Sequence, residues 1–239
     1  MKRILITGTT QGIGKAIVER LKEDYYIIGI NRNWDDAVSE NIICDLYDVK
    51  RVQDVCLDIE KYNIDVLINN AGGSKPCKFD ELSLEQITND INLNFISPML
   101  LMKAVIRGMQ KREYGRIINM SSISAKTATP YLHTYSAAKS ALDSMTNSCA
   151  VIYGGHNITI NSICPGAVNT ESSVNGRKII SQYKGLESEQ YQKLMIKGTG
   201  LNRMVRTDEV ASLVSFLLSD QAAAISGQRF NICGTLEMN

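Results

Sequence analysis

The sequence of 239 residues predicts a single α/β domain, built on a doubly wound parallel sheet of seven strands with helices on both faces. Two observations support this prediction. Short runs rich in Ile and Val alternate with longer segments of helical period along the whole chain. No internal repeat, low-complexity tract or linker interrupts the alternation, and the chain is long enough to bury one large core.

Seven short apolar runs are the predicted strands, because they have the length and the β-branched content of buried strands. In chain order they are RILIT (3–7), YYIIGI (25–30), NIIC (41–44), DVLIN (65–69), RIINM (116–120), ITINSI (158–163) and QRFNI (228–232). Since strands alternate with helical segments, we expect mostly parallel pairing.

The longest predicted helix runs from Ser83 to Met109. Ser83 and Gln86 form a capping-box pattern at its start, and apolar residues at helical spacing follow. Pro98 lies inside this helix and has no N–H to donate to the carbonyl of Asn94. We therefore expect a kink here, with the Asn94 carbonyl lacking its helical partner.

Three other helices are predicted: KAIVERL directly after Gly14, a small-residue helix from near Tyr135 to Gly154, and one for which Thr207 is the N-cap. The stretch 171–203 is polar and punctuated by glycines, so a long irregular loop is predicted there. A loop of this length in a compact domain more often serves function than not, and we interpret it as a lid.

The composition argues against several classes of protein. With 26 Lys and Arg against 25 Asp and Glu the net charge is 26 − 25 = +1, and no block of one sign indicates a nucleic-acid partner. The chain opens on MKRILITG, which lacks a signal-peptide pattern, and no apolar run reaches the roughly 20 residues that span a bilayer. Six scattered cysteines and two histidines indicate neither a metal site nor a disulfide framework. We expect a cytoplasmic protein with no membrane segment.

A glycine-rich turn joins the first strand to the first helix, with Gly8, Gly12 and Gly14 in the spacing G-x-x-x-G-x-G. Glycines here let the backbone turn tightly and approach a pyrophosphate, whose charge then lies at the helix N-terminus. Turn glycines without a ligand are the alternative, but the position after the first strand of a β/α pattern favours the dinucleotide site of a Rossmann fold.

The end of the second strand bears on the choice of dinucleotide. An acidic residue there binds the adenosine ribose hydroxyls of NAD, whereas an Arg accommodates the 2′-phosphate of NADP. The chain has Asn31 and Arg32 at this place, which favours NADP(H) over NAD(H). A solvated surface arginine is the alternative, and the nearby Asp35 and Asp36 keep NAD(H) open.

Tyr135 and Lys139 lie four residues apart, and that separation places them on one face of a helix, one turn from each other. An adjacent ammonium favours the phenolate and lowers a phenol pKa that is normally about 10. The pair is therefore predicted to act as an acid/base unit, against the alternative of two unrelated surface residues.

The motifs around Tyr135 and Lys139 argue against two unrelated surface residues. In order, the chain contains TGTTQGIG at 7–14, CDL at 44–46, NNAG at 69–72, Asn94, NMSS at 119–122, YSAAK at 135–139, PGAVNT at 165–170 and a late DEVASLVSFLLSD…ISGQRFNICG stretch. Over essentially the whole chain this resembles the short-chain dehydrogenase/reductase family, and most closely its compact members such as the 3-oxoacyl-carrier-protein reductases.

The resemblance implies four catalytic residues. Tyr135 would be the general acid and base, and Lys139 would bind the nicotinamide ribose and lower the tyrosine pKa. Ser122 would hydrogen-bond the reacting oxygen, and Asn94 would hold a water that connects Lys139 to solvent. Ser121 and Asn92 are the neighbouring alternatives; spacing favours Ser122, and the proline defect favours Asn94.

The resemblance also implies the residues that contact the dinucleotide. They are Gly8, Thr10, Gln11, Gly12, Ile13, Gly14, Asn31, Arg32, Asp45, Leu46, Asn70, Ala71, Gly72, Tyr135, Lys139, Pro165, Gly166, Val168 and Thr170. Asp45 and Leu46 would contact adenine, Asn70 the adenosine-side ribose, and Thr170 the nicotinamide carboxamide. Residues 1–120 would mainly bind the cofactor, and residues 121–239 would bind the substrate and perform catalysis.

The implied function is an NADP(H)-dependent ketoreductase or alcohol dehydrogenase, an oxidoreductase that transfers hydride between nicotinamide and a ketone or secondary alcohol. An NAD-dependent dehydrogenase of a sugar, polyol or cyclic diol is one alternative. A dinucleotide-binding regulator without catalysis is another, although a regulator has no need of the tyrosine. The resemblance also implies a homotetramer, in which the helices beginning near Ser83 and Tyr135 pack across one interface and the Thr207 helix and last strand across another.

The substrate would be a small-molecule or carrier-bound carbonyl compound, chosen by the loops 73–79, 123–134 and 171–203. We expect an anionic or carrier-bound substrate from the basic residues in these loops, although most are simply solvated on the alternative interpretation. They are Lys75, Lys78, Lys126, His133, Arg177, Lys178 and Lys184.

The chain departs from the family at two places. The motif that normally ends Gly-Gly reads Cys233-Gly234-Thr235. Where carrier-protein reductases have basic residues that dock the acidic carrier, this chain has Glu113 and His156, with Lys111, Arg112 and Arg116 nearby. This weakens the carrier-bound alternative.

Overall fold

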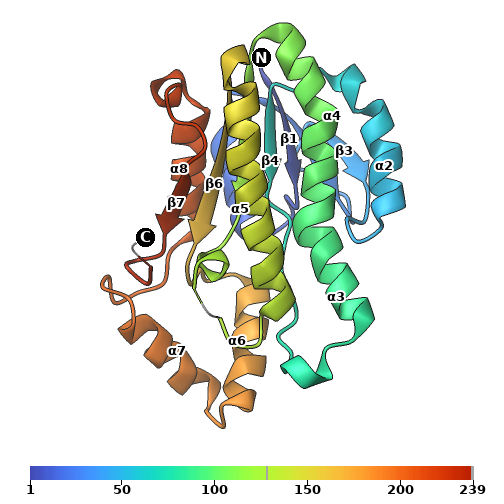
Figure 1. The fold of residues 1–239 in the computed structure, drawn as a ribbon. Coiled ribbons are helices and arrows are strands. Elements are labelled where there is room, and N and C mark those ends of the chain that lie inside the picture. The colour runs from blue at the N-terminus through green and yellow to red at the C-terminus, as the bar shows by residue number, and fades with distance from the viewer. Residues whose placement is uncertain (128, 238–239) are drawn as a thin grey trace.

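In a computed structural model that describes residues 1–127 and 129–237, seven parallel strands form one sheet in the order β3-β2-β1-β4-β5-β6-β7 (Figure 1). The strands are β1 (Arg3–Thr7), β2 (Tyr26–Asn31), β3 (Glu40–Ile43), β4 (Val66–Asn69), β5 (Gly115–Met120), β6 (Ile158–Pro165) and β7 (Arg229–Ile232). Each predicted strand is found within two residues of its expected bounds, and the predicted fold class is confirmed.

The strand order reverses beside β1. The chain passes from β1 outward to β2 and β3, and then returns to place β4 on the other side of β1, with Leu5 paired to both Ile28 and Leu67. Loops leaving the carboxyl ends of β1 and β4 therefore diverge to opposite faces of the sheet. The crevice at this switch point is where open α/β sheets bind their ligands.

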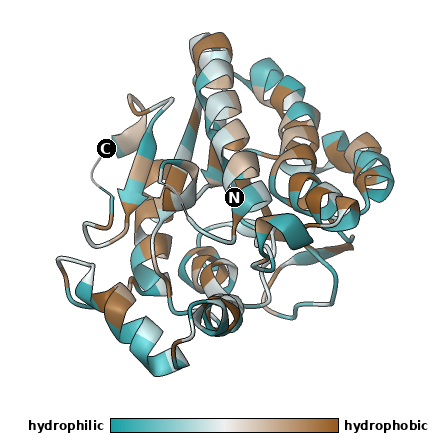
Figure 2. Ribbon diagram, turned by 60° about the horizontal axis from the view of Figure 1, so that its bottom comes forward, coloured by the Kyte–Doolittle hydropathy of each residue, from teal (hydrophilic) through white to brown (hydrophobic). Residues whose placement is uncertain are grey.

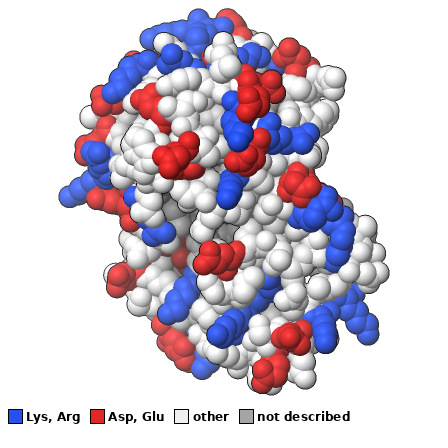
Figure 3. Space-filling view, turned by 180° about the vertical axis from the view of Figure 1, so that it is seen from behind, with Lys and Arg blue, Asp and Glu red and all other residues white. Residues whose placement is uncertain are grey.

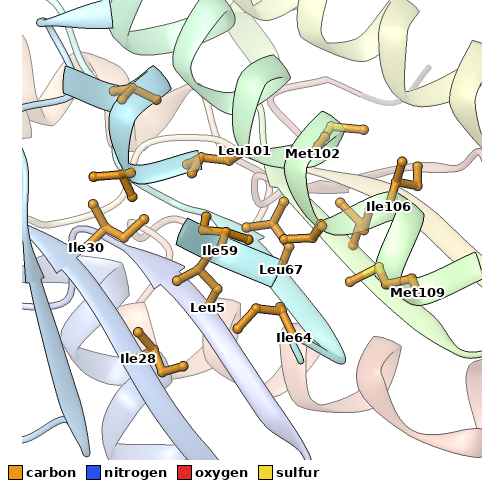
Figure 4. Packing of buried hydrophobic residues seen from close by; sticks show 14 of the residues in the cluster. Leu5, Ile28, Ile30, Ile59, Ile64, Leu67, Leu101, Met102, Ile106 and Met109 are labelled. Atoms are coloured by element: carbon orange, nitrogen blue, oxygen red, sulfur yellow. The ribbon is translucent and has the colours of Figure 1, made fainter. Parts of the chain in front are cut away.

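Helices cover both faces of the sheet (Figure 1). One face packs α1 (Gly12–Leu21) and α8 (Thr207–Leu218) against apolar strand residues such as Ile4 and Ile6. The other face packs α2 (Val49–Asp58), α4 (Ser97–Arg112) and α5 (His133–Tyr153) against residues such as Leu5 and Leu67 (Figure 4). Because side chains alternate along each strand, the Ile-rich strands supply both cores, and each fully buried Leu or Ile stabilises the fold by about 1.5–3 kcal/mol.

The predicted long helix is three consecutive segments: α3 (Leu84–Ile91), a π-helical turn η3 (Asn92–Ile96), and α4. Pro98 lies in the first turn of α4, directly after the π-turn, so the irregularity falls where the proline predicts it. Ser83 caps α3 by accepting the N–H of Gln86 at 3.1 Å. The side chain of Gln86 donates instead to the carbonyl of Lys75, so the reciprocal half of the capping box is absent.

The prediction of an irregular loop over 171–203 is wrong. This segment contains α6 (Glu171–Tyr183) and α7 (Ser188–Lys197), which project beyond the carboxyl ends of the strands (Figure 1). Each helix begins with a reciprocal capping box, Thr170 with Ser173 and Glu187 with Gln190, and these caps outweigh the glycines that suggested a loop. Figure 2 brings this end forward and shows both hydrophilic and hydrophobic residues on these helices.

The start of α8 also differs by one residue from the prediction. Arg206 is the N-cap, and Thr207 is the first helical residue. The Glu209 carboxylate accepts the Arg206 N–H at 2.9 Å, and Asp208 pairs with the Arg206 guanidinium, so acidic residues satisfy the helix start.

The short 3-10 segments are η1 (Ile59–Tyr62), η2 (Phe79–Glu81), η4 (Ile123–Ala125), η5 (Gly154–His156) and η6 (Asp220–Ala222).

The charged side chains are interspersed over the face seen in Figure 3, without a continuous area of one sign. Within the described ranges, no helix combines the length and the apolar character that crossing a bilayer requires.

The contact at Gly14 yields a stability prediction. A Cβ added there would lie 1.9 Å from the Gly8 carbonyl oxygen, so Gly14→Ala should force β1 and α1 apart and cost about 3 kcal/mol, which lowers the melting temperature by about 10 °C. Gly154→Ala is the matched control, because a Cβ at Gly154 meets nothing within 4 Å. Thermal unfolding of both variants checks this, and equal melting temperatures would contradict the packing described for the turn.

Candidate active site

Helix α5 brings Tyr135 and Lys139 to the carboxyl end of β5. Ala138 and Leu142 are fully buried on the same helix and allow it to lie close to the sheet. Lys139 is only 2% exposed, and its Nζ donates to the carbonyl of Met120, the last residue of β5, at 2.8 Å. The same Nζ lies 5.6 Å from the centroid of the Tyr135 ring. The two side chains predicted from the helical spacing are thus neighbours in the structure.

The two serines that follow β5 point to different places. Ser122 begins the 3-10 segment η4 by accepting the N–H of Ser124 at 3.1 Å, and its hydroxyl hydrogen-bonds the phenol of Tyr135. Ser121 is buried beside the carboxylate of Asp143. The geometry therefore brings Ser122, and not its neighbour, to the tyrosine.

The expected depression of the tyrosine pKa is not found. Tyr135 keeps part of its surface exposed, yet burial raises the pKa of its phenol, and the hydrogen bond with Ser122 only partly opposes this shift. The physical reason is that removal from water disfavours the charged phenolate more than the hydrogen bond favours it. A phenol with a raised pKa is protonated at neutral pH and is therefore poised to donate a proton.

Burial has the opposite effect on the pKa of Lys139. Removal from water lowers the pKa of Lys139 to about 8, and the negative charge of Asp143 opposes this shift. Asp143 lies one turn beyond Lys139 on α5 and is only 2% exposed. Burial raises its own carboxyl pKa, which the hydroxyls of Ser162 and Ser121 counteract. Asp143 is not among the residues predicted from the sequence, although its i+4 spacing from Lys139 places it on the same helix face.

Asn94 is fully buried in the π-turn, and its side chain fastens the loop that follows β4. Its Oδ1 accepts the Gly73 N–H at 3.0 Å, and its Nδ2 donates to the carbonyls of Gly73 and Asp90, each at 2.9 Å. A Cβ on Gly72 would lie 2.9 Å from both Asn94 Oδ1 and Lys139 Nζ, so these polar atoms converge on Gly72. That the Asn94 carbonyl binds a water stays a prediction.

Asn92, the alternative to Asn94, faces another loop. Its amide donates to the carbonyl of Tyr47 at 3.1 Å. Next to it, Ser97 donates to the carbonyl of Leu46 at 2.7 Å, and the exposed Asp45 accepts the Tyr47 N–H at 3.1 Å. The π-turn thus positions the predicted adenine loop as well as the catalytic side.

The glycine turn has the features that a pyrophosphate requires. The N-cap of α1, Gln11, makes no side-chain cap, so the first N–H groups of this helix have no side-chain acceptor from their own cap. Asn70 donates through its Nδ2 to the carbonyls of Thr7 and Gly8, each at 2.9 Å, which ties the end of β4 to the turn. The close approach at Gly14 leaves no room for a side chain. These residues fit a dinucleotide, and the contact of Asn70 with a ribose stays a prediction.

The end of β2 holds the same turn from the other side. Asn31 is buried; its Oδ1 accepts the Thr9 N–H at 2.8 Å and its Nδ2 donates to the Thr9 hydroxyl at 2.8 Å. The Asp35 carboxylate accepts a hydrogen bond from the same hydroxyl. Arg32 is exposed, and its charge acts on the phenol of Tyr47. Asp35, the acidic residue that could favour NAD(H), is thus already hydrogen-bonded to the glycine turn, whereas Arg32 is exposed to solvent.

The PGAVNT segment lies against the glycine turn at one end and against the residues after β7 at the other. Gly166 donates its N–H to the Ile232 carbonyl at 3.0 Å, and a Cβ there would lie 2.7 Å from that of Cys233. Thr170 caps α6 with its hydroxyl and lies against the turn, because a Cβ on Gly12 would be 3.2 Å from its Cγ2. The remaining predicted cofactor positions lie on or next to these same segments; they are Thr10, Ile13, Ala71, Pro165 and Val168.

Of the seven basic residues in the predicted substrate loops, Arg177 is buried. Its guanidinium donates to Ser173 Oγ at 2.9 Å and to Asn169 Oδ1 at 3.2 Å, which attaches α6 to the PGAVNT segment. The lysines on exposed positions are Lys75, Lys78, Lys178 and Lys184. Residue 128, within the predicted loop 123–134, lies outside the described residues.

The residues at the predicted carrier-docking positions pair with one another. Glu113 Oε1 lies 2.9 Å from His156 Nδ1, at the amino ends of β5 and β6, whereas Ser122 follows a carboxyl end. Arg116 is 1% exposed, and Arg112 pairs with Asp65 at 3.5 Å. Neither Arg112 nor Arg116 is therefore available to supply the positive charge that is missing at Glu113.

Comparisons with known proteins agree with this geometry. A family model described as short chain dehydrogenase matches residues 2–179. The chain is 31% identical over 251 residues to the 3-oxoacyl-(acyl-carrier-protein) reductase of Buchnera aphidicola, covering 99% of this chain and 98% of that protein.

Solved structures with bound cofactor are similar over nearly the whole chain. A crystal structure of an actinorhodin polyketide ketoreductase variant with NADPH has a TM-score of 0.90 at 28% identity and covers 98% of this chain and 97% of that one. A structure of 4-hydroxyisoleucine dehydrogenase complexed with NADH has a TM-score of 0.87 at 27% identity and covers 99% and 98% of the two chains. These comparisons extend the likeness to proteins that bind either nucleotide.

The buried ammonium yields a prediction with a definite sign. Because the folded-state pKa of Lys139 is about 8 and the ordinary value is 10.5, the charged ammonium destabilises the fold below pH about 8, and this penalty fades as pH rises toward 10.5. Lys139→Met should therefore raise stability at pH 7, by a gain on the order of 3 kcal/mol before loss of the Met120 hydrogen bond is subtracted. Thermal unfolding against pH measures the gain, with the exposed Lys103→Met as control. A variant that melts below the wild type at every pH would contradict the desolvated ammonium.

Proposed function

Because the chain belongs to the short-chain dehydrogenase family, we propose that Tyr135 is the general acid and base of a hydride transfer that prefers NADP(H). The protein is an NAD(P)-dependent oxidoreductase of ketones or secondary alcohols. The observation that supports the catalytic assignment best is the convergence of Ser122, Tyr135 and Lys139 where the ends of β5 and α5 meet. We also propose Asn94 as the fourth member.

The chemistry follows from these contacts. When bound, the dinucleotide supplies the hydride. Negative charge then develops on the carbonyl oxygen of the substrate, and the Ser122 hydroxyl stabilises it as a hydrogen-bond donor. Tyr135 delivers its phenolic proton to that oxygen, and its raised pKa keeps the proton in place until then. Lys139 holds positive charge beside the phenolate that remains, and the reverse path serves alcohol oxidation.

We propose residues 1–120 as the mainly cofactor-binding part and residues 121–239 as the catalytic and substrate-binding part. The glycine turn, Asn31, Arg32 and Asn70 come from the first part, and Ser122, Tyr135 and Lys139 from the second. The helices α6 and α7 would cover the substrate as a lid.

The choice of NADP(H) rests on the two charged groups after β2. Arg32 is exposed and accessible to a 2′-phosphate, and guanidinium groups bind phosphate through paired hydrogen bonds. Asp35 is already bonded to Thr9, which favours NADP(H) over the NAD(H) alternative.

The proposed substrate is a small-molecule ketone in preference to a carrier-bound one. The Buchnera aphidicola relative is named for a carrier-bound substrate. In this chain, however, Glu113 and His156 stand at the positions where the resemblance puts basic docking residues, and they hydrogen-bond one another. A sugar, polyol or cyclic diol remains the alternative within this class, and a cytoplasmic homotetramer is the proposed assembly.

Tyr135→Phe removes the proton donor and tests the catalytic assignment. We expect kcat/KM for ketone reduction with NADPH to fall by a factor of about 100 to 10,000, while the Kd for NADPH changes little. A panel of ketones read by NADPH consumption gives the first quantity, and nucleotide fluorescence titration gives the second. Tyr153→Phe, at the far end of α5, is the control and should act as wild type. If Tyr135→Phe left every measurable function unchanged, the non-catalytic regulator would be the better interpretation.

Arg32→Ala tests the nucleotide preference. Loss of a charge-assisted phosphate contact should raise the KM for NADPH by about 10- to 100-fold and leave the KM for NADH within about twofold. Arg107→Ala, on the exposed side of α4, controls for the change in net charge. An equal change for both nucleotides, or no change for either, would show that Arg32 does not select the 2′-phosphate.

A further inference from the structure

A buried carboxylate lies one helical turn before Asn94. Asp90 is the penultimate residue of α3, is only 4% exposed, and shares its buried side with the partly buried Ile87 and Ile91. Burial raises the pKa of its carboxyl group, and hydrogen bonds from Thr134 and Ser74 oppose this shift. A buried carboxylate is costly unless it is well bonded, and an apolar side chain would fill the same space without that cost. Its presence here calls for a specific partner.

The partners of Asp90 come from two other parts of the site. Its Oδ2 accepts a hydrogen bond from the hydroxyl of Thr134, the second residue of α5 and the direct neighbour of Tyr135. The same oxygen accepts a hydrogen bond from Ser74 Oγ at 2.8 Å. Ser74 belongs to the predicted substrate loop 73–79. One carboxylate oxygen thus joins the catalytic helix to the substrate loop.

Helix α5 needs such a partner because it has no cap of its own. Its N-cap residue is Leu132, whose side chain has no oxygen and makes no cap hydrogen bond. The first N–H groups of a helix carry partial positive charge, and a carboxylate near them is stabilising. Asp90 brings that charge to the first turn of α5 from α3.

The helical turn from Asp90 to Asn94 holds the predicted substrate loop 73–79 at two consecutive residues. Asn94, four residues after Asp90, holds Gly73 through two backbone hydrogen bonds, and Asp90 holds the next residue, Ser74. Displacement of Asp90 would therefore release the loop and the first turn of α5 together.

We propose that Asp90 is a positioning residue for the reaction, which sets Tyr135 and the 73–79 loop at the correct separation for a bound carbonyl substrate. This inference rests on the proposed function of Tyr135. Asp90 does not touch the reacting atoms; it acts through Thr134 and Ser74. A misplacement of about 1 Å in such a site can lower turnover by about 100-fold.

The test compares Asp90→Leu with Asp90→Asn. Asp90→Leu should lower kcat for ketone reduction by about 10- to 100-fold and leave the Kd for NADPH within about twofold. Asp90→Asn should recover most of kcat, because the amide oxygen can still accept both hydroxyl hydrogens. Asp54→Asn, on the exposed side of α2, is the matched control and should match the wild type.

A double-mutant cycle separates positioning from general stability. Thr134→Val should lower kcat, and the Asp90→Leu/Thr134→Val double variant should lose little more than Asp90→Leu alone, since both changes remove one interaction. Unchanged kcat in Asp90→Leu would overturn the proposal. So would a fall in kcat matched by equal losses of NADPH binding and melting temperature, which would indicate a structural role only.

Hydrogen exchange tests whether Asp90 fixes α5 and the 73–79 loop, even if no substrate is turned over. In Asp90→Leu, amides of the first turn of α5 and of Gly73 and Ser74 should exchange at least about tenfold faster, while those of β1 and β4 keep their protection. If the wild type reduced no ketone, the proposed function would fail, and this exchange pattern would still decide whether Asp90 fixes the two segments. Uniform exchange in the variant and the wild type would overturn the proposal.

Discussion

The burial of one ammonium, that of Lys139, is the constraint on which the site depends. The group is enclosed between α5 and the end of β5, where the Met120 carbonyl accepts its hydrogen bond. Gly72 must lack a side chain because a Cβ there would approach the ammonium and Asn94 within 2.9 Å. Small residues on α5 permit the close approach of the helix, and desolvation lowers the pKa of the ammonium. A charge held at this cost to stability indicates a functional site.

The sheet topology explains why the two halves of the chemistry meet. Strand order reverses at β1, so the glycine turn and the loop after β4 leave a crevice between them. Asn70 and Asn31 brace the turn from both sides, through Thr7, Gly8 and Thr9. The next strand outward, β5, ends at Met120, and Ser122 follows two residues later, which places the reacting end beside the crevice. Hydride donor and proton donor can thus approach one carbonyl from two neighbouring strand ends.

Much of this could be predicted from the sequence, because the signals are local. Strand lengths, the Tyr135–Lys139 spacing and the irregularity before Pro98 follow from periodicity and covalent chemistry. Helices α6 and α7 were not predicted, because the glycines in this segment suggested a loop and the capping pairs at Thr170 and Glu187 were overlooked. The tyrosine pKa was predicted in the wrong direction because desolvation depends on tertiary packing, which spacing does not contain. The contacts of Asp90 join segments distant in sequence and have no local signal beyond a carboxylate near apolar helix residues.

The most direct test of the account follows the hydride itself. NADPH that carries deuterium on the reactive carbon of the nicotinamide is incubated with the protein and a panel of ketones, and the alcohols are analysed by mass spectrometry and NMR. The account predicts one deuterium on the carbinol carbon of each alcohol formed, because the nicotinamide supplies the hydride and Tyr135 only a proton. Alcohol formed without deuterium at that carbon, or no NADPH consumption with any ketone, would contradict it.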